Sequence, residues 1–121
     1  MTTVLIIEDD EKSRRLLSDV LSFHGYRILQ TDRGEEGVEL LDSTDDVTLV
    51  LMDIQLPGIN GFEALARIRA STSRARTKVV AVTASVMESD RRRILDAGFD
   101  ACMPKPVNLK ELLGTVRAMA G

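Results

Sequence analysis

The sequence predicts an α/β domain in which helices cover both faces of a parallel β-sheet. Five short apolar runs suited to strands alternate with five amphipathic stretches suited to helices, and such alternation is typical of a covered parallel sheet. Three of the runs are continuously apolar, as expected for strands that are buried on both faces. The 121 residues contain no internal linker, repeat or low-complexity tract, so residues 1–121 are expected to form one domain.

The first two strands are expected to differ in their surroundings. Val4–Ile7 is continuously apolar and should be buried, whereas residues 26–31 alternate less cleanly and include Arg27 and Gln30, as an edge strand does. The helix between them is expected to end at Gly25. A second, short helix is expected over residues 34–41. The inward residues of these two helices should be Leu16, Leu17, Val20 and Leu21, and then Val38 and Leu41.

The stretch from Thr48 to Gly61 is the centre of the sequence. Its apolar run, Leu49–Met52, predicts a buried strand that ends at a single carboxylate, Asp53, and turn signals follow at once. Asn60 is expected to cap the next helix, because its side chain can accept a hydrogen bond from the first turn. The inward residues of that helix should be Phe62, Leu65 and Ile68. In a simpler interpretation, Asp53 only opens the turn before Pro57.

The last part of the chain repeats the alternation twice. Val79–Val82 predicts a buried strand, and residues 99–103 predict a short final strand that leads into Lys105 between two prolines. Asn108 and Glu111 have the spacing of a capping box at the start of the last helix. The inward residues of the two helices should be Met87, Ile94 and Leu95, and then Leu109, Leu112, Leu113 and Val116.

Composition argues against several classes of function. The net charge of −3 provides no overall positive field to attract nucleic acid or an anionic membrane. The single cysteine, Cys102, cannot form an internal disulfide, and the single histidine, His24, cannot build a zinc site with it. The apolar run at the amino terminus is too short for a signal peptide or a membrane span. We therefore expect a cytoplasmic protein with no direct nucleic-acid partner and no membrane insertion. Aromatic residues are also too scarce for a base-stacking surface: Phe23, Tyr26, Phe62 and Phe99.

Polar side chains follow four of the expected strands. Right-handed crossovers place all strand-to-helix loops at the carboxyl edge of a parallel sheet, where open α/β sheets bind their ligands. Two carboxylates about 4 Å apart repel by about 4 kcal/mol at an effective dielectric of about 20. An acidic group at this edge must therefore hold a proton or a cation, and magnesium suits its oxygen ligands. The residues expected there are Glu8, Asp9, Asp53, Thr83 and Lys105.

Magnesium beside a free carboxylate favours phosphoryl transfer. Asp53 would then be the nucleophile and form an acyl phosphate, while Lys105 and Thr83 would contact phosphoryl oxygens. The residues expected at this edge of the sheet also have plainer interpretations. Asp9 and Asp10 could cap the first helix. Lys105 could be a solvated loop residue, and Thr83 could bond its own backbone.

Four motifs in the chain resemble those of a bacterial response regulator receiver domain of the CheY-like kind. They match in kind, order and spacing, and the resemblance extends over the whole chain. Within this family the chain is most similar to single-domain regulators of the DivK kind and to receivers of hybrid sensor kinases. The motifs are Val-Leu-Ile-Ile-Glu-Asp-Asp at 4–10, Leu-Met-Asp-Ile-Gln-Leu-Pro-Gly-Ile-Asn-Gly at 51–61, Val-Val-Ala-Val-Thr-Ala-Ser at 79–85 and Pro-Lys-Pro at 104–106.

The resemblance implies a flavodoxin-like, doubly wound (βα)5 fold with strand order 2-1-3-4-5. It implies that Asp53 is the phosphoacceptor and receives its phosphoryl group from a histidine kinase or a histidine phosphotransferase. The protein would be a signalling switch rather than an enzyme with a separate substrate, and a downstream protein would read the face formed by residues 84–119.

The resemblance also implies a set of metal and phosphoryl contacts. Asp9 and Asp53 would bind Mg²⁺, with Mn²⁺ as an alternative, through their side chains, Gln55 through its backbone carbonyl and Glu8 through water. Thr83 and Lys105 would contact the phosphoryl group. The peptide bond between Lys105 and Pro106 is commonly cis in the family.

One position departs from the family pattern. Receivers usually carry Tyr or Phe three residues before the lysine, where the ring changes rotamer on phosphorylation, but this chain has Cys102. A thiol cannot sweep out the volume of a ring, so Thr83 and the loop after it are expected to carry the switch. In the simpler interpretation, Cys102 is a small buried hydrophobic residue at a strand end.

Three other features are open to a functional or a plain interpretation. Gln55 and Ser85 could set the lifetime of the acyl phosphate by admitting or excluding the attacking water. The run Arg91–Arg93 could contact a partner or could simply form a solvated face.

Two other classes of protein compete with the receiver. Phosphatases of the haloacid-dehalogenase kind normally have a general acid two residues after the nucleophile, whereas this chain has Gln55, which cannot transfer a proton. A pseudo-receiver would lack one of the acids. Since the chain leaves no room for an output domain, we expect either a lone receiver or one excised from a longer protein.

Overall fold

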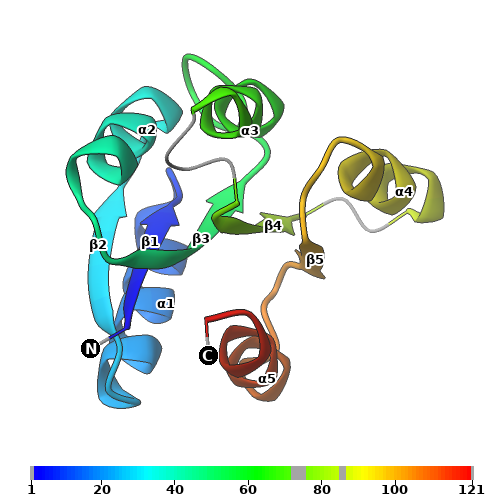
Figure 1. The fold of residues 1–121 in the computed structure, drawn as a ribbon. Coiled ribbons are helices and arrows are strands. Elements are labelled where there is room, and N and C mark those ends of the chain that lie inside the picture. Colours follow the sequence, from blue (N-terminus) through cyan, green and yellow to red (C-terminus); the bar gives the residue numbers. More distant parts are fainter. Residues whose placement is uncertain (1, 72–75, 85–86, 121) are drawn as a thin grey trace.

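The computed structural model describes residues 2–71, 76–84 and 87–120. Over these residues, five strands and five helices alternate along the chain (Figure 1). The elements are β1 (Thr3–Ile7), α1 (Glu11–Phe23), β2 (Arg27–Thr31), α2 (Gly34–Ser43), β3 (Val47–Asp53), α3 (Gly61–Ala70), β4 (Lys78–Thr83), α4 (Glu88–Asp96), β5 (Ala101–Pro104) and α5 (Leu109–Ala120).

The five strands form one parallel sheet in the order β2-β1-β3-β4-β5. This confirms the predicted α/β class, the strand order that the family resemblance implied, and the edge position of the second strand. The register pairs Ile7 with Met52, and Met52 with Ala81. The carboxyl ends of β1, β3 and β4 therefore lie side by side.

Alternate residues of the central strands feed two separate cores. On β1, Leu5 and Ile7 face one side of the sheet, and Val4 and Ile6 face the other. Helices α2, α3 and α4 cover the first side, whereas α1 and α5 cover the second (Figure 1). The helical residues buried against the first side are Leu41, Leu65, Ile68 and Ile94, and those against the second are Leu17, Leu21, Leu112 and Val116.

Two helix starts follow the sequence prediction. Asn60 caps α3 in a capping box, because its side chain accepts from the Glu63 amide and the Glu63 side chain accepts from the Asn60 amide. Before α5, the Glu111 amide donates to Asn108 Oδ1 over 3.0 Å. Both caps satisfy amides that have no partner within their own helix.

The predicted inward faces of the helices were too wide. Consecutive residues point about 100° apart on a helix, so where Leu17 and Ile94 face inward, the adjacent leucine faces outward. Met87 and Leu109 are exposed because they lie at the amino ends of α4 and α5. The last strand was also placed too early, since it starts at Ala101, and Phe99 before it is buried in the core instead. The residues wrongly expected to face the core are Leu16, Met87, Leu95 and Leu109, with exposed fractions of 48, 68, 41 and 42%.

None of the helices in the described part of the chain is both long enough and apolar enough to cross a bilayer.

The two leucines of α5 allow a test of the core. Leu112 is 0% exposed and Leu109 is 42% exposed. We expect Leu112→Ala to lower the free energy of unfolding by about 2–5 kcal/mol, because it leaves a cavity between α5 and the sheet. Urea denaturation measures this change, and Leu109→Ala is the matched control. Equal losses in the two variants would contradict the placement of α5.

Candidate functional site

The sheet brings the ends of several strands together at its carboxyl edge. Glu8 and Asp9 directly follow β1, and Asp53 is the last residue of the neighbouring strand β3. Thr83 ends β4, and Lys105 directly follows β5. The register and the strand order therefore account for the convergence, because parallel strands end on the same side.

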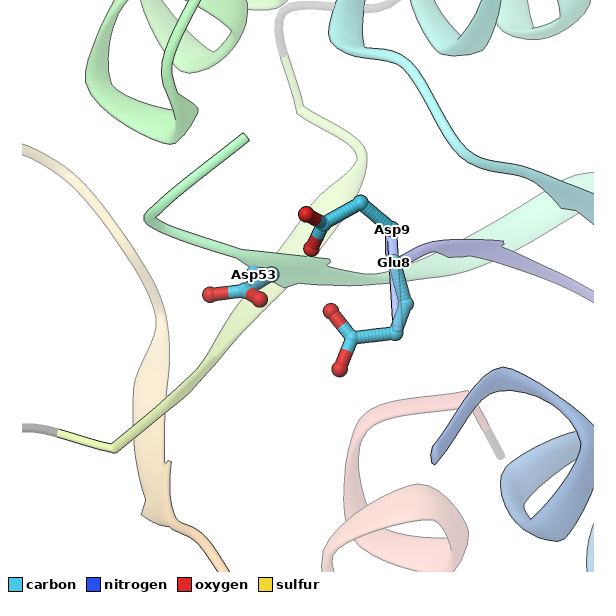
Figure 2. A group of neighbouring side chains, drawn as sticks. All are labelled: Glu8, Asp9 and Asp53. Atoms are coloured by element: carbon cyan, nitrogen blue, oxygen red, sulfur yellow. The ribbon is translucent and has the colours of Figure 1, made fainter. Parts of the chain in front are cut away.

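Three carboxylates gather at this edge. One carboxylate oxygen from each of Glu8, Asp9 and Asp53 lies within 4.8 Å of the other two. Figure 2 shows the three side chains projecting from the ends of the two neighbouring strands. Glu8 is only 2% exposed and Asp53 only 6%, whereas Asp9 is exposed. Two of the three acids are therefore removed from water, where their mutual repulsion is strong.

Lys105 bridges the two buried acids. Its Nζ donates to Asp53 Oδ2 over 2.9 Å and to Glu8 Oε1 in a short contact. The Lys105 side chain is itself half-buried. One ammonium group thus offsets part of the charge of three carboxylates, and the group remains net negative.

Burial and the neighbouring acid act together on Glu8. Desolvation, reinforced by Asp53, raises the pKa of Glu8 from 4.5 to about 8, although Lys105 opposes the shift. For Lys105, burial alone would lower the pKa, but the hydrogen bonds to Glu8 and Asp53 raise it above its usual value. The lysine therefore stays charged, and the excess negative charge is relieved by a proton on Glu8 or by a bound cation.

The loop between β3 and α3 holds the second oxygen of Asp53. The Gln55 amide donates to Asp53 Oδ1 over 3.1 Å. The chain then turns back sharply, and the Gly61 amide donates to the Ile54 carbonyl over 2.8 Å. A Cβ at position 61 would lie 2.7 Å from the Asp53 carbonyl oxygen, so only glycine lets α3 start this close to the site.

Thr83 lies next to Lys105 through the backbone of β4 and β5. The Lys105 amide donates to the Thr83 carbonyl over 2.8 Å, and Thr83 is buried. The peptide bond between Lys105 and Pro106 is cis. On its other side Thr83, together with Gln55 and Arg93, lines a cleft of about 140 Å³ that extends toward α4.

Cys102 does not point into this cleft or into the acidic group. It lies on β5, paired with Ala81, and packs half-buried against the core on the α2, α3 and α4 side. Burial raises the pKa of its thiol. This placement fits the simple interpretation of a small apolar residue.

The geometry argues against helix capping by Asp9 and against a solvated Lys105. Asp10, not Asp9, caps α1: Asp10 Oδ2 accepts from the Ser13 amide over 3.1 Å and from the Ser13 hydroxyl over 2.6 Å. Asp9 is therefore not the cap of this helix, and its carboxylate belongs to the acidic group. Lys105 is no solvated loop residue, since it contacts both buried acids.

Sequence reasoning missed two residues near the site. Arg14 on α1 donates from Nη1 to the Glu8 carbonyl over 2.9 Å and so supports the backbone of that acid. Glu35 at the start of α2 accepts from the Ile59 amide in the β3–α3 loop over 3.2 Å. No local sequence pattern predicts either contact, because both depend on how the loops pack. Ser85, the other residue expected to affect the lifetime of the acyl phosphate, lies outside the described residues.

The acidic group fits a hard divalent cation. Glu8 Oε2 is buried and has no hydrogen-bond partner among the described residues, and a buried carboxylate oxygen without a partner is costly. Carboxylate and backbone carbonyl oxygens are the ligands that Mg²⁺ prefers. Glu8, Asp9 and Asp53 supply such oxygens within 4.8 Å of one another.

The comparisons with known proteins all point to the same family. Residues 4–117 match the family profile described as the response regulator receiver domain. The polar-differentiation response regulator DivK of Brucella ovis is 32% identical, over 98% of this chain and 96% of its own. The transcriptional regulatory protein CpxR of Klebsiella pneumoniae is 35% identical over 98% of this chain but only 49% of its own. The chain thus spans about half the length of the CpxR relatives that it matches.

Solved structures agree with the sequence matches. The receiver domain of a sensor histidine kinase from Pseudomonas aeruginosa PAO1 superimposes with a TM-score of 0.91 at 28% identity, and the match covers 99% of this chain and 98% of that one. That structure has a magnesium ion coordinated in its active-site cleft. This chain belongs to the response regulator receiver family of two-component systems, whose members are signalling switches.

Proposed function

We propose that residues 1–121 form one receiver domain that accepts a phosphoryl group on Asp53 from a histidine kinase or histidine phosphotransferase. The observation that carries the proposal is the contact of Lys105 with Asp53 inside a group of three acids. That arrangement leaves a carboxylate nucleophile with a cation on one oxygen and two further acids beside it.

In the proposed transfer, Asp53, Lys105 and Thr83 each have a role. An Asp53 carboxylate oxygen forms a bond to phosphorus as the bond from phosphorus to the donor histidine nitrogen breaks. The electron pair of the broken bond stays with the imidazole, which takes up a proton. Lys105 and the Thr83 hydroxyl are then placed to contact phosphoryl oxygens and to offset their charge.

Glu8, Asp9, Asp53 and the Gln55 carbonyl would hold Mg²⁺, or Mn²⁺ in its place. The ion would neutralise charge on the transferring phosphoryl group. Glu8 Oε2, buried and without a hydrogen-bond partner among the residues that the structure describes, supports this proposal, because it lies in the acidic group.

Output is proposed to pass to a protein partner through the face formed by residues 84–119. Among its described residues, Met87 and Leu95 are exposed apolar side chains, and Arg91 and Arg92 are exposed cations. Arg93 is less free than a solvated residue, since its guanidinium carbon lies 4.9 Å from the centre of the Phe62 ring. The switch would run through Thr83 and the loop after it, because Cys102 cannot replace an aromatic side chain there.

The proposal includes a cytoplasmic location, and the unpaired Cys102 suits such a reducing compartment.

The phosphoacceptor can be tested directly. Incubation with Mg²⁺ and acetyl phosphate is expected to add one phosphoryl group to the intact mass of the protein. Asp53→Asn should abolish the addition, because an amide oxygen is a poor nucleophile and its phosphoryl adduct is not formed. Asp19→Asn removes an exposed acid of α1 and is the matched control. Unchanged labelling of Asp53→Asn would overturn the assignment.

The raised pKa of Glu8 predicts how stability depends on pH without metal. The folded protein holds a proton on Glu8 up to a pKa of about 8, whereas the unfolded chain releases it near 4.5. In EDTA, this group should therefore lower the free energy of unfolding as the pH rises from about 5 to 8, by about 1.4 kcal/mol for each unit of pKa difference.

Chemical denaturation at several pH values measures this dependence. Glu8→Gln should remove most of the decline, and Mg²⁺ should oppose it in the wild type by binding the ionised form. Glu11→Gln, which changes an exposed acid at the start of α1, is the control. An equal decline in Glu8→Gln would assign the effect to other groups.

A further inference from the structure

The loop between β3 and α3, residues 54–60, is tied to the amino end of α2. The Ile59 amide donates to Glu35 Oε1 over 3.2 Å, across 24 residues of sequence. Helices α2 and α3 lie side by side on the same face of the sheet (Figure 1). The loop that leads from Asp53 into α3 therefore runs past the first turn of α2.

Glu35 binds two backbone amides at once. Its own amide and that of Ile59 both hydrogen-bond to its carboxylate, and they lower the pKa of Glu35 below its usual value. Within the described part of the chain, the side chain of Arg33, the residue before α2, makes no capping hydrogen bond. Glu35 thus satisfies an amide at an otherwise uncapped helix start and an amide of the loop with the same group.

The approach of the loop to this carboxylate is close. Gly58 has a φ of +73°, and a Cβ there would lie 2.6 Å from Glu35 Oε2. A Cβ at Gly34 would lie 2.9 Å from Ile59 Cγ1. Glycine at both positions is what allows the start of α2 and the loop to pack against each other.

The other end of the same loop contacts the phosphoacceptor. The Gln55 amide donates to Asp53 Oδ1 over 3.1 Å, and the Gln55 carbonyl belongs to the proposed set of magnesium ligands. The Gly61 amide closes the loop on the Ile54 carbonyl over 2.8 Å. Only three residues separate Gln55, which contacts Asp53, from Ile59, which contacts Glu35. A change of backbone conformation at one of these two contacts therefore affects the other.

We propose that Glu35 is a positioning residue for the magnesium centre: by holding the β3–α3 loop against α2, it fixes the Gln55 backbone beside Asp53. This inference rests on the proposed function, since it concerns the affinity of that centre. Residues that orient metal ligands without touching the metal commonly change metal affinity by about 10–100-fold when they are replaced.

Variants of Glu35 separate its contact from its charge. Glu35→Ala removes both. Glu35→Gln keeps an oxygen acceptor for the Ile59 amide but removes the charge, and Glu35→Asp keeps the charge but withdraws the oxygen by one methylene. Glu36→Ala removes an exposed acid from the same first turn and is the matched control for helix and long-range charge effects.

Isothermal titration calorimetry of the full chain with Mg²⁺ gives the first measurement. We expect Glu35→Ala and Glu35→Asp to weaken binding by on the order of tenfold, and Glu35→Gln and Glu36→Ala to stay within about twofold of the wild type. If the effect came only from charge, Glu35→Gln and Glu36→Ala would weaken binding as well, and the inference would be wrong.

Amide hydrogen exchange gives a second measurement that does not depend on magnesium or phosphorylation. Exchange at Ile59 should accelerate in Glu35→Ala and Glu35→Asp but not in Glu35→Gln or Glu36→Ala. With acetyl phosphate, Glu35→Ala should raise the Mg²⁺ concentration for half-maximal phosphorylation more than it lowers the rate at saturation.

The outcomes distinguish a failure of the proposed function from a failure of the role proposed for Glu35. If the wild type itself neither binds Mg²⁺ nor becomes phosphorylated, the proposed function fails. If the wild type does both and Glu35→Ala and Glu35→Asp behave like it, only the role of Glu35 is overturned. Thermal unfolding of each variant identifies any loss of folding, and Glu35→Asp tests the contact should Glu35→Ala not fold.

Discussion

The site depends on one lysine that crosses the sheet edge to reach two buried acids. In the order β1-β3-β4-β5, strand β4 lies between β3 and β5, so Lys105 starts two strands away from Asp53, about 10 Å in a sheet with strands about 4.8 Å apart. Only a long side chain spans that gap. Its ammonium joins residues that are 52 and 97 positions away in the sequence, so both ion pairs form only when β1, β3, β4 and β5 have assembled.

In the same group, a proton, the lysine and the proposed divalent cation would compete for one set of carboxylate oxygens. The central strands are apolar in their middle, and the acids lie at their carboxyl ends, so the core is apolar and the charge of this group is concentrated at one edge. A single ammonium cannot balance three carboxylates. Protonation of Glu8 relieves part of the remainder, and under the proposed function a cation would relieve it instead by favouring the ionised carboxylate.

Periodicity and topology made most of the fold predictable. Continuous apolar runs and right-handed crossovers sufficed to bring Glu8, Asp53 and Lys105 to one edge. The failures are local. Leu16 is apolar but exposed, because only one of two consecutive helical residues can point at the sheet, and Leu17 does. Leu109 is exposed although Leu112 on the same face is buried, because Leu109 is the first residue of α5. The contact of Glu35 with Ile59 was not predictable, because it depends on the path of a loop that no periodic pattern describes.

The two sides of the β3–α3 loop differ in how much movement they permit. Toward α2 the loop is held by the hydrogen bond to Glu35 and by the close approach of Gly58 to the Glu35 side chain. Toward α4 it borders a cleft of about 140 Å³ lined by Gln55, Thr83 and Arg93. Densely packed atoms resist displacement, whereas side chains beside a cleft can change rotamer at little cost. Under the proposed function, charge added at Asp53 would therefore be accommodated more easily on the α4 side, where both Arg93 and Asp90 line the cleft.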